Sequence, residues 1–330
     1  MLDLPERGKN LAIRDIARIF IIGGTHGNER IGVHATQYIH EHTAEFACGS
    51  VHTIKTLIGS PKAVIRNARY IETDLNRSFT YDYSSPKSNQ DVEQVLSGDG
   101  DYEIKRALEI RRELNALLKP VDFLIDLHTT TSNMGNCLIV SDNDPWTLHL
   151  CASLVGTVPE CRILYDPVSR QEDRTSSSLG INQVTLEMGP VQQGVTDYPA
   201  VQTALNIIKS VIKTIDELNG KDNLASKELP KTQVFKRLNY RIDYPRGQDG
   251  IAAALIHDEF VGKDFSGLTM EQPVFITFDG RVINFGEGKY FPAALVSAVA
   301  RGEEIVPFFI GEAAYVEKGM AFLTARPGLV

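Results

Sequence analysis

The sequence predicts an α/β protein with a larger N-terminal domain and a smaller, β-rich C-terminal domain. Between residues 17 and 219, short apolar runs typical of buried strands alternate with segments of helical periodicity. This alternation predicts helices packed on a largely parallel sheet. After residue 219, the apolar runs are shorter and are broken by Gly, Pro and Asp, which favours strands joined by turns. We therefore divide the chain into domains 1–219 and 220–330.

The expected elements of the first domain follow one another along the chain. Apolar runs predict strands, and amphipathic runs that end at Pro or Gly predict helices. The expected strands are 17–24, 51–58, 121–128, 137–142, 162–164 and 183–188. The expected helices are 31–42, 102–118, 145–155 and 199–218. The polar segment 81–100 is expected to cross the surface as a long loop.

The second domain begins with a change of composition. Residues 220–230, GKDNLASKELP, are mostly polar and contain a proline, which indicates a linker. Strand-like runs follow at 232–242, 273–285 and 303–311, and no long helix is expected among them.

Composition limits the class of protein and of partner. The chain has 330 residues, of which 42% are apolar and 23% charged, as in ordinary globular proteins. With a net charge of -8 and no basic patch, nucleic acid is not an expected partner. No apolar run approaches the ~18 residues of a membrane span, and the polar start MLDLPERGKN does not resemble a signal peptide. Four cysteines without C-x-x-C spacing favour free thiols in a reducing compartment. We expect a cytoplasmic protein without a membrane partner, and a homodimer is one oligomeric state that the sequence leaves open.

Two polar runs suggest a divided metal site. His26 and Glu29 lie in GGTHGNER after the first expected strand, and His128 ends the apolar run VDFLIDLH. Two imidazoles and one carboxylate form the protein ligand set of a catalytic zinc, with one position left for water. The alternative is three unrelated polar residues in separate loops, since H-x-x-E often occurs by chance. A histidine at the end of a second buried strand, with Asp126 placed to orient a ligand imidazole, favours the metal site.

Further polar residues are candidates for catalysis and binding. Glu187, at the end of the strand QVTLEM, could move a proton between water and a leaving amine. Arg69, Asp74, Asn76 and Arg77 fall within nine residues, and an arginine fork suits a carboxylate or a developing oxyanion. The alternatives are a solvated glutamate and a charged surface loop. For the segment of Arg69 to Arg77, the residues alone do not decide between a binding site and a charged surface loop.

With these residues assembled, the chain resembles the aspartoacylase family of zinc N-acyl amino acid deacylases, within the carboxypeptidase-like metallohydrolases. The matching runs are GGTHGNE, RYIETDLNRSF, DLHTTTSNMG, LEMGP and EAAYVEK. They occur in the same order and span residues 23 to 318. The resemblance implies an α/β/α zinc-carboxypeptidase-like catalytic domain, followed by a smaller C-terminal β-rich domain that shapes the substrate channel.

The resemblance also implies chemical roles. His26, Glu29 and His128 would bind one Zn²⁺ per chain. Glu187 would be the general base and then the general acid, and Arg69 would polarise the amide carbonyl.

Substrate-binding roles follow from the same resemblance. Asn76 and Arg77, in the segment that includes Asp74, would hold the α-carboxylate of the substrate together with Tyr315. Phe309 would lie beside the substrate.

The side-chain pocket is where the chain departs from the family. Arg174 matches the family's arginine for a side-chain carboxylate, with Lys318 nearby, and Arg170 is the alternative. About three extra residues lie between Arg174 and Glu187 relative to the family's loop length, and a family tyrosine has no counterpart. We expect hydrolysis of N-acetyl-L-aspartate to acetate and L-aspartate. The alternatives are deacylation of other N-acyl amino acids, or a non-catalytic zinc- or ligand-binding protein of the same fold.

Overall fold

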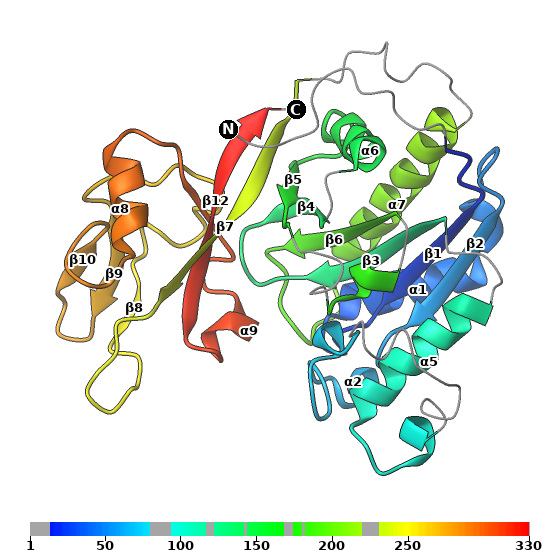
Figure 1. The fold of residues 1–330 in the computed structure, drawn as a ribbon, viewed down its shortest axis with the longest axis horizontal. Coiled ribbons are helices and arrows are strands. Elements are labelled where there is room, and N and C mark those ends of the chain that lie inside the picture. Colours follow the sequence, from blue (N-terminus) through cyan, green and yellow to red (C-terminus); the bar gives the residue numbers. More distant parts are fainter. Residues whose placement is uncertain are drawn as a thin grey trace.

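The computed structural model describes residues 14–79, 94–116, 122–141, 144–167, 174–179, 182–219 and 231–329. Most of the expected loop 81–100 and the whole expected linker 220–230 lie outside these ranges. Figure 1 shows a large α/β body and a smaller β-rich part, with two long strands running between them. All four cysteines are free thiols. Within the described ranges, no helix combines the length and apolar character needed to cross a membrane.

A nine-stranded sheet forms the centre of the large body, in the order β11-β12-β7-β5-β4-β6-β3-β1-β2. The strands of the N-terminal part agree with the expected ones to within about two residues, the usual uncertainty of an element boundary. They are β1 (Arg18–Gly23), β2 (Thr53–Ile58), β3 (Phe123–Thr129), β4 (Gly135–Val140), β5 (Cys161–Tyr165) and β6 (Gln183–Gly189). The C-terminal strands of this sheet are β7 (Gln233–Asp243), β11 (Val306–Phe308) and β12 (Met320–Leu329).

The direction of the strands differs in part from the expectation of a largely parallel sheet. Strands β2, β1, β3 and β6 are parallel neighbours. The direction then reverses, because β4 pairs antiparallel with β6, and β5 and β7 run parallel to β4. An apolar run indicates a strand that is covered on both faces, but it does not indicate the direction of that strand. Such a strand has the same apolar pattern in parallel and in antiparallel pairing.

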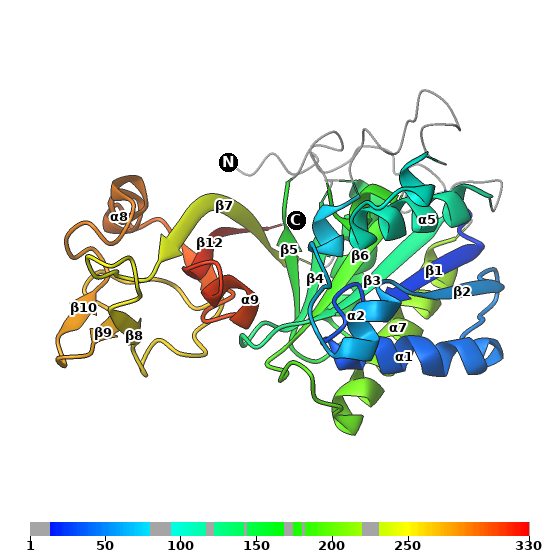
Figure 2. The same cartoon turned by 90° about the horizontal axis from the view of Figure 1, so that it is seen from below.

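Helices cover both faces of this sheet. The described α-helices are α1 (Arg30–Glu41), α2 (Pro61–Arg66), α5 (Tyr102–Ala116), α6 (Pro145–Val155), α7 (Tyr198–Leu218), α8 (Ala293–Ala300) and α9 (Ala313–Val316). Figure 2 shows α1 and α7 on one side of the sheet and α5 on the other. Ile21 packs in the core under α1, α6 and α7, whereas the next residue, Ile22, packs with Ile110 of α5. Successive side chains of a strand point to opposite faces, so the α/β/α layers that the family resemblance implied are confirmed.

The C-terminal part is joined to the large body by the sheet itself. Strands β7 and β12 form an antiparallel pair that extends the central sheet beyond β5. At their far end, β8 (Ala254–Ile256), β9 (Pro273–Thr277) and β10 (Val282–Asn284) form a separate antiparallel sheet, which shares an apolar core with α8. The sequence predicted the β-rich character, but it missed the short helices α8 and α9. Both span eight residues or fewer, too short for a clear helical period.

Candidate metal and substrate site

Three neighbouring strands bring the candidate residues to one edge of the sheet. His26 and Glu29 lie in the turn between β1 and α1, and His128 is near the end of β3. Glu187 of β6 stands directly opposite His128 in the parallel register. Because the carboxyl ends of parallel strands meet at the same edge, residues that are far apart in sequence gather there.

Glycines permit the sharp turn that holds His26. Gly24 has a φ of +69°, a left-handed conformation that favours glycine. Gly27 packs directly on α2, where an added Cβ would lie 2.1 Å from the carbonyl carbon of Ala63. Its amide donates to the carbonyl of Arg69 at 3.2 Å. The turn is therefore fixed against the segment that carries the candidate arginines.

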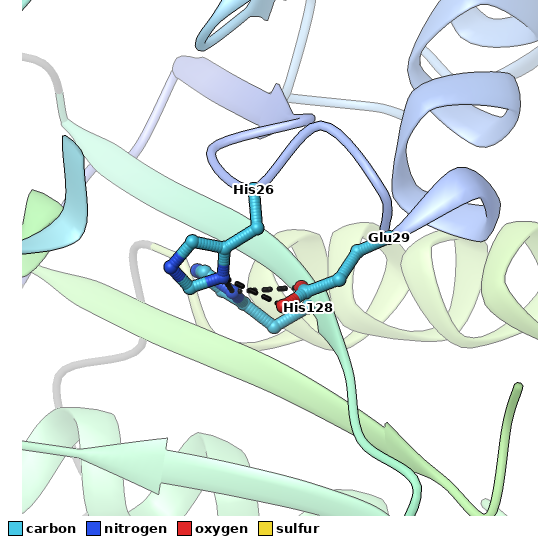
Figure 3. Close-up of side chains that lie close together, drawn as sticks. All are labelled: His26, Glu29 and His128. Atoms are coloured by element: carbon cyan, nitrogen blue, oxygen red, sulfur yellow. Dashed lines mark hydrogen bonds and ion pairs between the residues drawn. The ribbon is translucent and has the colours of Figure 1, made fainter. Parts of the chain in front are cut away.

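The side chains of His26, Glu29 and His128 converge in a buried cluster, as Figure 3 shows. Nδ1 of His26 lies 2.6 Å from Oε1 of Glu29, and Nδ1 of His128 lies 3.0 Å from Oε2 of the same carboxylate. The two Nδ1 atoms are 3.2 Å apart. Each of the three residues is no more than 3% exposed, so these donor atoms face one another inside the protein.

The outer nitrogens of both imidazoles contact carboxylates. Nε2 of His26 lies 3.0 Å from Asp74, and Nε2 of His128 lies 2.9 Å from Asp126, the contact that the sequence predicted. Asp126 also accepts hydrogen bonds from Thr25, at 2.9 Å, and from Ser176. A carboxylate on the outer nitrogen is the usual arrangement around a metal-bound histidine, because it fixes the ring and leaves the inner nitrogen as ligand.

The chemistry of this cluster fits a divalent zinc. Burial raises the pKa of the Glu29 carboxyl, but the charges and hydrogen bonds of His26 and His128 outweigh it and hold the pKa far below its usual range. Burial lowers the pKa of His128, but Asp126 and Glu29 raise it well above the ordinary value. Two imidazoles and one carboxylate, all oriented inward, form the ligand set that zinc prefers in hydrolases.

Glu187 faces the same cavity from the neighbouring strand. Burial, with the nearby negative charges of Glu29 and Glu312, raises the pKa of Glu187 well above its ordinary value, and His128 partly opposes this rise. A carboxyl group with a raised pKa beside a ligand cluster can both accept and donate a proton.

The segment that contains Arg69 forms another wall of the cavity. Arg69 lies 3.3 Å from Glu29 and 3.5 Å from Asp74. Among the described residues, its buried Nε has no hydrogen-bond partner. Asn76 accepts a hydrogen bond from the backbone of Ser176 at 3.1 Å, and Arg77 also lines the cavity. Arg69 and Asn76 are both partly buried. The alternative interpretation of this segment, a charged surface loop, therefore does not apply to these two residues.

The C-terminal part closes the cavity with two aromatic residues. Phe309 and Tyr315 both line it, and their rings are 5.2 Å apart in an edge-to-face contact. Phe309 has a φ of +57°, a strained conformation for a bulky residue of the kind that gathers at functional sites. Burial raises the pKa of Tyr315, and the positive charges of the neighbouring arginines partly oppose this rise.

Nine of the candidate residues therefore line one cavity, and three do not. The nine are His26, Glu29, Arg69, Asn76, Arg77, His128, Glu187, Phe309 and Tyr315. Asp74 lies behind His26 instead. The side chains of Arg174 and Lys318 are exposed, and neither lines the cavity. The expected position of Arg174 beside the substrate is thus not what the structure shows, and the alternative, Arg170, lies outside the described residues.

Sequence analysis missed three charged residues of the cavity: Asp166, Arg237 and Glu312. Asp166 follows β5, and Arg237 lies in β7 among other polar residues. No spacing or motif distinguishes them from surface charges, because they come together only when β7 pairs with β5. Glu312 was visible as the first residue of EAAYVEK, but only the fold shows that it is buried.

Comparison with known proteins agrees with this fold. Residues 15–215 match the family model of the succinylglutamate desuccinylase/aspartoacylase catalytic domain. The chain belongs to this family. Residues 231–327 match the family's AstE/AspA barrel-sandwich hybrid domain, which describes the β-rich part built around β7 to β12.

Relatives and solved structures cover almost the whole chain. A probable aspartoacylase of Acaryochloris marina is 34% identical, over 93% of this chain and 94% of the relative. The mouse N-acyl-aromatic-L-amino acid amidohydrolase (carboxylate-forming) is also 34% identical, over 94% of this chain and 91% of the relative. The crystal structure of murine aminoacylase 3 matches with a TM-score of 0.79 at 31% identity, covering 96% of this chain and 97% of that structure. Members named for different substrates are thus similar to this chain to the same degree.

Proposed function

We propose that this protein is a zinc-dependent amidohydrolase that cleaves N-acetyl-L-aspartate to acetate and L-aspartate. The observation that carries the proposal is the buried cluster of His26, Glu29 and His128, with Glu187 beside it in one cavity. The names of the family relatives, aspartoacylase and amidohydrolase, support hydrolysis of N-acyl amino acids.

Proton transfer is the role of Glu187 in this proposal. Zinc, when bound, would supply Lewis-acid activation of water and of the amide carbonyl. Glu187 accepts a proton from the attacking water and returns it to the amide nitrogen, so that the product leaves as an amine. Its raised pKa suits the second of these steps, because a carboxyl group must hold the proton until the leaving group needs it.

Charge stabilisation is the role of Arg69. The developing oxyanion needs a donor that is in place before the reaction begins. Arg69 is held by Glu29 and Asp74 at 3.3 and 3.5 Å. Its guanidinium remains protonated, because these acidic neighbours outweigh burial and raise its pKa.

We assign the α-carboxylate of the substrate to three other residues of the same cavity. Asn76, Arg77 and Tyr315 together offer an amide, a guanidinium and a phenol. An arginine fork binds carboxylate in a planar arrangement, so we expect the substrate to need a free α-carboxylate.

A second candidate is deacylation of neutral or aromatic N-acyl amino acids. The similarity to the mouse amidohydrolase favours it, as does the exposed position of Arg174 away from the cavity. The apolar part of the lining, which includes Ile139, Phe309 and Tyr315, could receive such a side chain.

The two candidates are separated by a substrate panel. The zinc-loaded protein is assayed by amine release from the N-acetyl derivatives of aspartate, glutamate, methionine and tyrosine. We expect the highest kcat/KM with N-acetyl-L-aspartate. A preference for methionine or tyrosine would replace the substrate and keep the reaction. Absence of hydrolysis throughout would overturn the amidohydrolase itself.

A further inference from the structure

Arg237 is a cation of the cavity that the proposed chemistry does not use. It lies in β7, which pairs in parallel with β5 so that Tyr165 stands opposite Lys236. This register brings Arg237 to Asp166, the residue after β5, and their side chains form an ion pair of 2.6 Å. Both residues line the cavity that contains the metal-ligand cluster.

The ion pair leaves most of the guanidinium available. Only Nη1 of Arg237 bonds to Asp166, and no other side-chain hydrogen bond of Arg237 occurs within the part of the chain that the structure describes. A guanidinium has five N–H donors in a planar fork. The two side chains are 35% and 24% exposed, so the pair is open to the cavity rather than sealed in the core. Asp166 therefore holds the arginine in one orientation, while its other donors can meet a ligand.

The other arginines of the cavity already have partners or roles. Within the described residues, three arginines line it. Arg69 is held by the carboxylates beside the metal cluster, and Arg77 stands beside Asn76, to whose carbonyl it donates at 2.6 Å. The charges of all three act on the hydroxyl of Tyr315, which places Arg237 near the same substrate volume but on a different strand.

We infer that Arg237, oriented by Asp166, binds the side-chain carboxylate of the substrate and makes acidic N-acyl amino acids the preferred class. This inference rests on the proposed amide hydrolysis and adds the residue that selects among substrates. A bidentate contact between a guanidinium and a carboxylate is directional as well as strong. A substrate with a neutral or apolar side chain offers no carboxylate to Arg237. The arginine therefore adds no binding energy for such a substrate.

The test compares Arg237→Met with the matched control Arg174→Met in the zinc-loaded protein. Both substitutions remove a guanidinium and keep a long side chain, but only the first changes the cavity. We expect Arg237→Met to lower kcat/KM for N-acetyl-L-aspartate by about 100-fold and to leave N-acetyl-L-methionine largely unchanged. Arg174→Met should change neither. Zinc content and circular dichroism, which should match the wild type, show that the site and the fold persist.

A binding measurement separates recognition from turnover. Calorimetric titration of the product L-aspartate should show affinity for the wild type that Arg237→Met loses and Arg174→Met keeps. Equal losses on both substrates, no loss on either, or a selective loss in the Arg174 variant would each overturn the role of Arg237 and leave the amidohydrolase intact. A wild type that hydrolyses only neutral substrates would do the same. A wild type that hydrolyses none would remove the proposed function and this inference together.

Discussion

The carboxylate of Glu312 accepts hydrogen bonds from both the backbone amide and the hydroxyl of Thr131, at 2.7 and 2.9 Å. Thr131 follows His128 by three residues, whereas Glu312 begins the short helix that carries Tyr315. The same carboxylate accepts a hydrogen bond from Gln193 at 3.0 Å. One buried side chain therefore joins the C-terminal part to the segment that follows β3, the strand that carries His128.

Glu312→Ala is expected to destabilise the protein and to impair the site. The substitution leaves the part-buried amide and hydroxyl of Thr131 without their acceptor, and the loss of a buried acceptor costs about 1–3 kcal/mol. The midpoint of urea unfolding should fall, and kcat/KM should fall with it, because Tyr315 and His128 lose a shared anchor. Glu317→Ala, which changes an exposed residue of the same segment, is the control. An unchanged midpoint in Glu312→Ala would show that the carboxylate is not an anchor.

We expect about one zinc per chain, bound by the cluster around His26. Another group of carboxylates, at Glu72, Asp101 and Glu103, also lies close together, but Glu103 is occupied by backbone amides, the shortest of these bonds being 2.8 Å. His26→Ala should lose tight zinc binding in metal analysis after dialysis, and His52→Ala, which alters an exposed histidine, should keep it. Full zinc in the His26 variant would refute the site.

The sequence predicted the elements of the fold better than their arrangement. The continuous apolar run of Phe20, Ile21 and Ile22 indicates a buried strand. Its side chains point alternately to the two faces of the sheet, so both faces receive apolar side chains. The reversal between β6 and β4 was not predictable, since the pattern of a buried strand is the same in both directions. The continuation of the sheet into β7 and β12 depends on pairing between distant segments, which local periodicity does not report.

The candidate site divides in the same way. Residues within motifs, such as His26 and Glu187, line one cavity. They come together because β1, β3 and β6 are neighbouring parallel strands. The pocket that we propose for the substrate side chain does not follow from motifs. Arg174 appears in the right region of the sequence but is exposed, whereas Arg237 enters the cavity only through the pairing of β7 with β5. Substrate-binding residues in loops and distant strands vary more than the metal cluster, so resemblance places them less securely.

Glu187→Gln should retain zinc and lose most of the activity. Glutamine has nearly the same shape as glutamate, but it cannot accept the proton of water, and the expected loss in kcat is about 10²–10⁴-fold. Single-turnover measurements on N-acetyl-L-aspartate, together with zinc analysis, check both parts. Turnover near that of the wild type would assign the proton transfer to another group.

Asp264 is expected to make stability depend on pH through a contact outside the metal cluster. Its carboxylate accepts hydrogen bonds from the backbone amides of Ile310 and Asn133, at 3.0 and 3.2 Å. Burial nevertheless raises its pKa to about 6 from the 3.8 of an exposed carboxyl, against the opposing effect of these amides. Between these two pKa values, Asp264 is therefore protonated in the folded state and ionised in the unfolded state.

The direction of the effect follows from that difference in proton binding. Because the folded pKa is the higher one, the contribution to stability is fully present below the unfolded pKa and is lost as pH rises through about 6. Asp264→Asn cannot titrate, so the free energy of unfolding of the wild type should fall relative to this variant by about 2 kcal/mol between about pH 4.5 and 7.5. Urea unfolding of both proteins across this range measures the difference, in which the titration of all other groups cancels. A difference that stays constant with pH would show that the carboxyl titrates alike in both states, and one that changes in the opposite direction would show that the two amides outweigh burial.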